Sequence, residues 1–203
     1  MSNGNTMFVN IHTHRPTGCD TEIATAGVHP WDAEHGDIAA VEAAIGRIDA
    51  IGEIGLDYAC KADRAAQQRI FEAQLELAER SGLPVVLHCV KAFEPVMKTL
   101  AEYRLKAVIF HGFIGSREQM RQAVAAGYYV SFGERTFASP KTLGAMREIP
   151  KERMFLETDD SPTGIAEIYR HAAEAIGIDI ETLKRTITEN YNGIFGKTDE
   201  QMA

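Results

Sequence analysis

Short apolar runs rich in β-branched residues alternate along the chain with segments of helical periodicity. This alternation constrains the fold more than any other feature, because it predicts parallel strands covered by helices. The strands predicted from the runs span residues 7–12, 23–29, 50–56, 84–88, 107–111, 128–132 and 154–158. A closed barrel and a doubly wound open sheet would both satisfy the pattern.

Helix signals lie between the predicted strands. Asp37, Ser116 and Asp179 each precede a segment whose apolar residues recur at helical spacing, and each can cap the N-terminus of a helix. A further helical segment runs from Asp63 to Arg80, before Gly82. The apolar stripes indicate packing against a sheet.

Length and composition favour one globular domain spanning residues 1–203. With 45% hydrophobic and 25% charged residues, the chain can bury one sizeable core. Cys19, Cys60 and Cys89 form neither a CxxC pair nor an even-numbered disulfide set, which is typical of a reducing compartment. No apolar run approaches about 18 residues, and the first residues lack the pattern of a signal peptide. We therefore expect a cytoplasmic protein that does not span a membrane; the sequence indicates no oligomeric state.

The net charge of −8 argues against a broad basic surface that wraps nucleic acid. It is compatible with a local site that binds an anion through metal ions.

Residues able to bind metal ions follow or interrupt several of the predicted strands. They are His12, His14, Glu53, His88, His111 and Asp159. In a (β/α) barrel the carboxyl ends of the strands converge at one mouth, whereas an open sheet would spread these residues along a line. We therefore predict an α/β fold of the TIM-barrel type.

His12 and His14 are two residues apart on a predicted strand, so both imidazoles project from the same face and can reach one ion. An isolated HxH pair is weak evidence, and a single strand-end histidine is often a core residue. Glu53 strengthens the case, because desolvating an unpaired carboxylate within the apolar AIGEIGL segment would be costly. For His29, in GVHPW, the sequence leaves two interpretations open: it lines the site or it packs beside Trp31.

The segments GVHPW, AIGEIGLDY, LPVVLHC, HGFIGS and FLETDDSP, following HTH in this order, resemble the TatD family of metal-dependent hydrolases. The resemblance spans Phe8 to Pro162, and the segment ETLKRTITENYNGIF resembles the family's C-terminal part. It implies an amidohydrolase-like barrel enzyme, deoxyribonuclease-like in activity, in a shortened form.

The resemblance also implies a dinuclear centre with six ligands. One divalent ion would be held by His12, His14 and Asp159, the other by His88 and His111, with Glu53 bridging the two. Imidazole and carboxylate ligands suit Zn, Mn or Fe and, less well, Mg. Two divalent ions with two carboxylates leave a positive centre that attracts an anionic phosphoester. Asp159 is the candidate general base, and Glu53 is the second candidate catalytic residue.

Two positions differ from the family's pattern. Asn10 stands where the family usually has aspartate, on the same strand face as His12, and can orient a ligand only through a hydrogen bond. After His88, Val90 replaces a family arginine and Lys91 follows, so a bidentate phosphate contact becomes at best a point charge. We expect Asn10, His29 and Lys91 to support the ligands or contact substrate.

The third difference is length. Only eight residues separate His14 from Ile23, too few for the helical crossover that joins parallel strands. We therefore predict a distorted barrel of seven strands, lacking one strand–helix unit after the first strand.

Two classes of function follow from these residues. The first is metal-dependent hydrolysis of a small anionic phosphoester or of short or single-stranded DNA ends, with carboxylic-ester or amide hydrolysis as the chemical alternative. The second is a degenerate relative that binds metal ions without turnover. The presence of all six proposed ligands favours the enzyme, since a decaying site is expected to lose ligands first.

Overall fold

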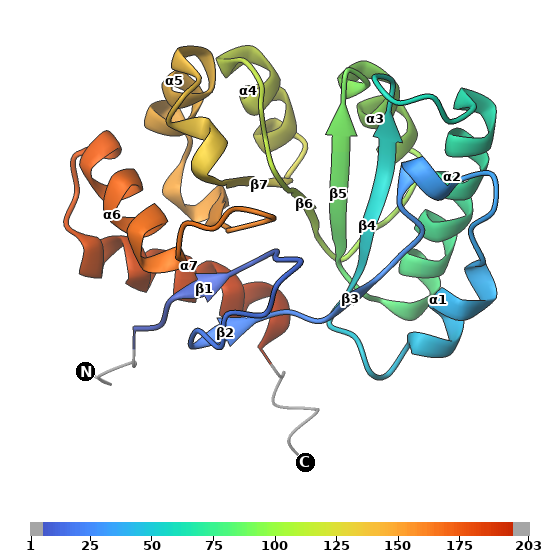
Figure 1. Ribbon diagram of the computed structural model, residues 1–203, viewed down its shortest axis with the longest axis horizontal. Coiled ribbons are helices and arrows are strands. Elements are labelled where there is room, and N and C mark those ends of the chain that lie inside the picture. The colour runs from blue at the N-terminus through green and yellow to red at the C-terminus, as the bar shows by residue number, and fades with distance from the viewer. Residues whose placement is uncertain (1–5, 197–203) are drawn as a thin grey trace. The chain divides into compact units, whose positions relative to one another are not determined.

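The computed structural model describes residues 6–196, which form parts of two compact units (Figure 1). Among the described residues, unit 1 draws on 6–22, 112–125 and 130–196, and unit 2 on 23–111 and 126–129. In both units parallel strands alternate with helices, which confirms the predicted α/β class.

Unit 2 is built on four parallel strands, paired in their order along the chain. They are β3 (Thr25–Ala26), β4 (Ala50–Asp57), β5 (Val85–Val90) and β6 (Val108–Phe110). Its helices are η1 (Pro30–Asp32), α1 (Ile38–Ala44), α2 (Arg64–Ser81) and α3 (Phe93–Leu100). Helix α2 packs along β4, and β4 and β5 run side by side (Figure 1). The buried face of α2 includes Phe71, Leu75 and Ala78 at helical spacing, so apolar burial sets the orientation of this helix.

The predicted helix starts of unit 2 are confirmed by their caps. The side chain of Asp37 accepts a hydrogen bond from the backbone N–H of Ala39 at 2.9 Å, and that of Asp63 accepts one from Ala66 at 2.8 Å. Gly82 ends α2 with φ of 66°, a left-handed conformation that favours glycine.

Unit 1 contains two short parallel pairs. Strand β1 (Val9–Asn10) pairs with β2 (Thr21–Glu22), and β7 (Tyr129–Phe132) pairs through residues 130–132 with β8 (Met154–Leu156). A hydrogen bond of 3.1 Å from the N–H of Ile11 to the carbonyl of Leu156 connects β1 to β8.

The helical elements of unit 1 are α4 (Arg117–Ala125), η2 (Glu134–Thr136), α5 (Pro140–Glu148), η3 (Lys151–Arg153), α6 (Ile165–Ile176) and α7 (Ile180–Phe195). Ser116 and Gln119 form the predicted capping box, with reciprocal hydrogen bonds of 2.9 and 3.2 Å. Asp179 caps α7 through the N–H of Thr182 at 2.9 Å, also as predicted.

The structure differs from the predicted strand count at β2. Within residues 6–196 there are eight strands, because each of the seven predicted runs overlaps one and Thr21–Glu22 adds another. Residues 11–20, which connect β1 to β2, contain no helix. Two-residue strands pair in parallel after a short coil, whereas the prediction judged this segment too short for a further parallel strand and expected one strand–helix unit to be missing. The predicted irregularity after the first strand is therefore a connection without a helix. The two strands that it joins, β1 and β2, still pair in parallel.

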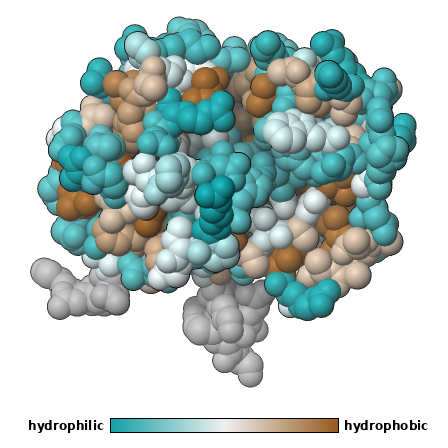
Figure 2. Space-filling model, viewed as in Figure 1, coloured by the Kyte–Doolittle hydropathy of each residue, from teal (hydrophilic) through white to brown (hydrophobic). Residues whose placement is uncertain are grey.

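Strand residues form the core of each unit. Ile51, Ile54 and Leu56 of β4 and Phe155 of β8 are fully buried, while the face shown in Figure 2 is covered mainly by hydrophilic side chains. Among the described helices, none combines the length and apolar character needed to cross a bilayer.

Candidate metal-binding site

Glu53 lies in an irregular part of β4 that two glycines make possible. The register between β4 and β5 shifts over residues 51–54. A Cβ atom on Gly52 would lie 2.6 Å from a Cβ atom of β5, and one on Gly55 would lie 2.0 Å from a carbonyl oxygen of β5. The glycines of the GEIG segment are thus required by the close approach of the two strands.

Three histidines of unit 2 surround the Glu53 carboxylate. Its Oε2 atom lies 2.7 Å from His111 Nε2, 3.5 Å from His88 Nδ1 and 3.8 Å from His29 Nε2. The Glu53 side chain is only 6% exposed, so it is almost fully desolvated and needs such partners. Donor atoms of Glu53, His29 and His88 all lie within 4.8 Å of one another. We call Glu53, His29, His88 and His111 the Glu53 cluster.

His29 combines both interpretations that the sequence left open. It belongs to the Glu53 cluster, and its ring packs edge-on against Trp31 with centroids 4.8 Å apart. Burial, reinforced by neighbouring His88, lowers the pKa of His29 to about 4. Its imidazole is therefore neutral at pH 7, the form that binds a metal ion.

Asp57, at the end of β4, was missed by the sequence prediction. Its Oδ2 atom accepts a hydrogen bond from Trp31 Nε1 at 2.7 Å and lies 3.3 Å from His88 Nε2. Burial alone would raise the pKa of this carboxyl, but hydrogen bonds from Trp31, the backbone of Ala59 and His88 hold it below its usual value. The available signal was its position at the end of an apolar strand, which it shares with the predicted ligands.

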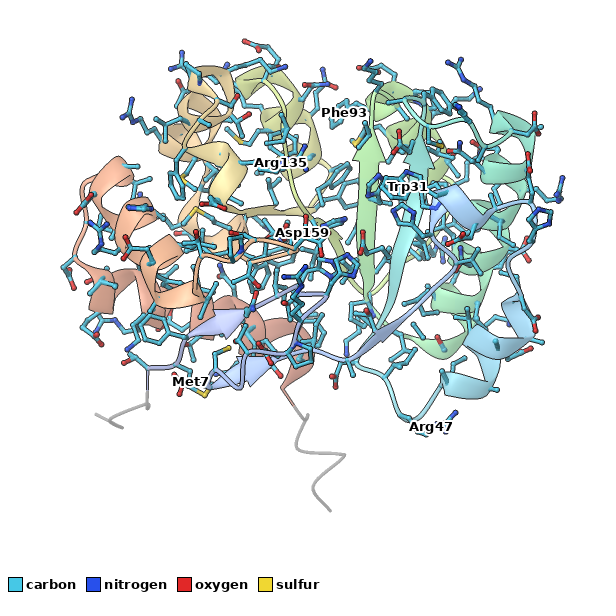
Figure 3. All side chains as sticks on the ribbon, in the orientation of Figure 1. Met7, Trp31, Arg47, Phe93, Arg135 and Asp159 are labelled. Atoms are coloured by element: carbon cyan, nitrogen blue, oxygen red, sulfur yellow. The ribbon has the colours of Figure 1, made fainter. Side chains whose placement is uncertain are left out.

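A second cluster lies in unit 1, where His12, His14 and Asp159 come together. The Oδ1 atom of Asp159 lies 3.8 Å from His12 Nε2 and 3.5 Å from His14 Nε2. Backbone hydrogen bonds join the two segments: Asp159 N–H donates to His12 at 3.1 Å, and His14 N–H donates to Asp159 at 3.3 Å. Donor atoms of all three residues lie within 4.8 Å of one another. We call this the Asp159 cluster (Asp159 is labelled in Figure 3).

Asn10 supports the Asp159 cluster through the backbone. It is fully buried, donates through Nδ2 to Thr158 Oγ1 at 2.9 Å, and accepts the N–H of Thr158 through Oδ1 at 2.9 Å. Nδ2 also lies 3.4 Å from Glu22 Oε1. These bonds fix the residue directly before Asp159, so the hydrogen bonding expected of Asn10 acts on the position of that ligand.

A cavity of about 260 Å³ adjoins Asp159 in unit 1. Its lining includes four carboxylates, those of Glu134, Glu157, Asp159 and Asp160. Arg135 is the basic residue among the described lining residues, and the sequence prediction missed it. Like the predicted ligands it follows a strand, in this case β7. A guanidinium here can bind an anion close to the Asp159 cluster.

The donor sets of both clusters fit a divalent cation. Each combines imidazole nitrogen with carboxylate oxygen, as Zn, Mn and Fe sites do. Lys91 lies outside both sets: it is exposed and directly follows β5, with a φ of 52°.

Parallel strands with helices, carrying histidine–carboxylate clusters near their carboxyl ends, define the class of α/β metal-dependent hydrolases. The family model for TatD related DNases matches residues 19–196, and the chain belongs to this family. The predicted family is therefore confirmed.

Curated relatives and solved structures agree with this assignment. The uncharacterized metal-dependent hydrolase YabD of Bacillus subtilis (strain 168) is 32% identical over 199 residues, covering 87% of this chain and 78% of the relative. The 3'-5' ssDNA/RNA exonuclease TatD of Escherichia coli (strain K12) is 31% identical over 202 residues, covering 85% and 77%.

The fold is also shared with solved members of the family. The structure of YjjV, a TatD homologue from Escherichia coli K12, matches with a TM-score of 0.79 and 27% identity, covering 87% of this chain and 78% of that one. A TatD family hydrolase from Entamoeba histolytica matches with a TM-score of 0.76 at 21% identity, which supports the fold alone. The TIM-barrel type of fold predicted from the strand ends is confirmed.

Proposed function

We propose that this TatD-type hydrolase is a metal-dependent phosphodiesterase that cleaves nucleotides from the ends of short or single-stranded nucleic acid. The observation that carries the proposal is the gathering of all six predicted ligand residues into histidine–carboxylate clusters, one in each unit. Relatives named as 3'-5' ssDNA/RNA exonucleases support the substrate class.

The proposed function uses two divalent ions, one for each cluster. The Asp159 cluster would hold one, and His88 and His111 of the Glu53 cluster would hold the other; the bridging role of Glu53 stays a prediction. When bound, such ions activate a water molecule and neutralise charge on the phosphate. The imidazole-rich ligand set favours Zn, Mn or Fe over Mg. We propose that residues 1–203 form a single hydrolase domain.

Asp159 is the residue that we propose as general base. Its side chain is 27% exposed and lines the cavity, so water can reach the carboxylate that would accept a proton from the attacking water. Arg135, in the same lining, is placed to bind a non-bridging phosphate oxygen, and Lys91 would add a point charge. Glu53 is held away from water and would position the centre.

Charge and cysteine content support the remaining parts of the proposal. With a net charge of −8 the chain is poorly suited to hold a long duplex through phosphate contacts, and a strand end needs few of them. The three cysteines are free thiols, which fits a cytoplasmic protein.

The test is metal content and activity on phosphodiester, phosphomonoester and carboxylic-ester substrates. We expect about two divalent ions per chain and preferential phosphodiester cleavage; in Glu53→Ala cleavage should be lost and bound metal should drop by about half. Glu76→Ala, which removes an exposed carboxylate of α2, is the matched control and should leave both unchanged. Uptake of no metal, or full activity of Glu53→Ala, would contradict the proposal. Cleavage of carboxylic esters alone would favour the alternative chemistry.

A further inference from the structure

Trp31 makes hydrogen bonds through both its backbone and its ring although most of its surface faces solvent. It is the chain's single tryptophan and is 63% exposed. Its indole Nε1–H donates to Asp57 Oδ2 at 2.7 Å, and its backbone N–H donates to His29 Nδ1 at 3.3 Å. One exposed aromatic residue is unremarkable in itself, but this one is fixed at both its backbone and its ring.

The contacts of Trp31, which is labelled in Figure 3, lead to the Glu53 cluster. Asp57, which accepts the indole N–H, also lies 3.3 Å from His88 Nε2, and the other ring nitrogen of His88 lies 3.5 Å from Glu53. The indole ring is 4.8 Å from the ring of His29 and 6.4 Å from that of His88. The exposed indole therefore borders the residues that we propose to hold a metal ion.

We propose that Trp31 is a base-binding residue, on which the nucleobase next to the scissile phosphate stacks. The inference rests on the proposed function and adds how the substrate is recognised. Stacking on an aromatic side chain contributes about 1–3 kcal/mol per base and accepts every base. The chain has a net charge of −8 and carries Val90 where the family usually has an arginine, so it has few means of binding a phosphate backbone by charge. A fixed aromatic surface supplies affinity that does not depend on charge.

Direct binding is measurable through the fluorescence of this tryptophan. The full metal-loaded protein is titrated with a phosphorothioate-linked single-stranded tetranucleotide, which resists cleavage, and with the same backbone lacking bases. We expect the base-bearing strand to quench the indole emission and the abasic strand to leave it unchanged. Equal responses to both strands would overturn the proposal.

Kinetics separate stacking from the hydrogen bond to Asp57. Trp31→Ala should raise KM for a base-bearing oligonucleotide about tenfold to hundredfold, while its KM for an abasic phosphodiester stays near wild type. Trp31→Phe keeps a ring but loses the N–H, so it should retain most of the base preference. Ile45→Ala, which removes another exposed apolar side chain of unit 2, should change neither KM.

The outcomes distinguish this inference from the proposed function. If the wild type cleaves both substrates with the same KM, the phosphodiesterase stands and base stacking is wrong. If Trp31→Ala and Trp31→Phe lower turnover of both substrates equally, Trp31 acts only through Asp57 and His88. If the wild type cleaves neither substrate, the proposed function fails, and base-dependent quenching alone decides whether Trp31 binds bases.

Discussion

The Glu53 cluster and the Asp159 cluster use the same residue types in different surroundings. In the Glu53 cluster the carboxylate is 6% exposed and has three imidazoles within 3.8 Å. In the Asp159 cluster the carboxylate is 27% exposed and His14 is 49% exposed. The Glu53 cluster is enclosed, and Asp57 connects it to Trp31 through side-chain contacts. The Asp159 cluster lies open beside a cavity.

This difference indicates a division of roles between two chemically similar sites. A desolvated carboxylate with fixed partners keeps its geometry without reorganisation, which suits a tightly held ion. An accessible carboxylate can exchange protons with water and meet substrate, which suits a general base. We infer that the Glu53 cluster mainly holds metal and that the Asp159 cluster mainly performs the proton transfer.

Replacing Glu53 should have the largest effect. Glu53→Gln removes the negative charge that three imidazoles share, and no solvent can replace it there. We expect kcat to fall about 10⁴-fold and bound metal to drop by about half. Activity assays and metal analysis of purified protein check both, with Glu76→Gln as the exposed control. Full metal content in Glu53→Gln would contradict the inference that the Glu53 cluster mainly holds metal.

Asp159→Asn should reduce kcat less, by about 10²-fold, because water reaching the open site can accept the proton in place of the carboxylate. Metal content should change little, since His12 and His14 remain. Measuring bound metal in Asp159→Asn and in Glu53→Gln under the same conditions compares the two clusters directly. Equal metal loss in both would show that the two clusters hold ions in the same way.

The candidate ligands could be proposed from the sequence because they share a local signature. They are polar residues that follow, end or interrupt apolar strands: His12, Glu53, His88, His111 and Asp159. Helix caps such as Asp37 carry equally local signals. These features are set by neighbours in the chain. Burial of the strands and the parallel pairing then follow from the same apolar pattern.

Asp57 and Arg135 also lie at or after the end of a strand, but the tertiary contacts that give them a role were not predictable from that position. Asp57 matters because it joins Trp31 to His88, and Arg135 because it lines a cavity with Asp159. Neither relation is visible in local spacing. Strand β2 was missed for a related reason, since a two-residue strand exists only through its pairing with β1.

Arg135→Ala should have a moderate effect, confined to substrate binding. Losing a charged hydrogen bond to phosphate is expected to raise KM for a phosphodiester about tenfold with kcat nearly unchanged. Arg135→Lys should recover only part of the loss, because an ammonium group cannot bind phosphate in a bidentate manner. Lys141→Ala removes an exposed cation of α5 and serves as the charge-matched control. An unchanged KM in Arg135→Ala would exclude the cavity as the phosphate site.

Asn10→Asp, which restores the residue usual in the family, should destabilise this chain. It places a carboxylate at a fully buried position where the Asn10 amide now donates to Glu22 and Thr158. We expect a loss of about 1–3 kcal/mol in the free energy of unfolding, measured by denaturant titration. Combining it with Glu22→Gln should recover part of the loss, because an amide can donate to the new carboxylate. If the free energy of unfolding does not recover in the double variant, the contact with Glu22 is not the cause of the lost stability.

The smallest effect is expected at Lys91, which shares one backbone feature with Asp159. Within residues 6–196 these two are the non-glycine residues with positive φ, at 52° and 53°, and each follows a strand, one in each unit. Aspartate adopts this conformation more readily than lysine, so the strain is greater at Lys91.

Lys91→Asn and Lys91→Ala both remove the charge, but asparagine tolerates left-handed backbone better than alanine does. We expect Lys91→Asn to unfold at a temperature a few degrees higher than Lys91→Ala, for a difference of about 1 kcal/mol. If Lys91 contacts substrate, KM should rise equally in both variants, because the lost charge is common to them. If KM instead rises more in Lys91→Ala, the variant with the lower unfolding temperature, than in Lys91→Asn, the cause is the backbone conformation after β5 and not the ammonium group. That conformation would then affect the Glu53 cluster.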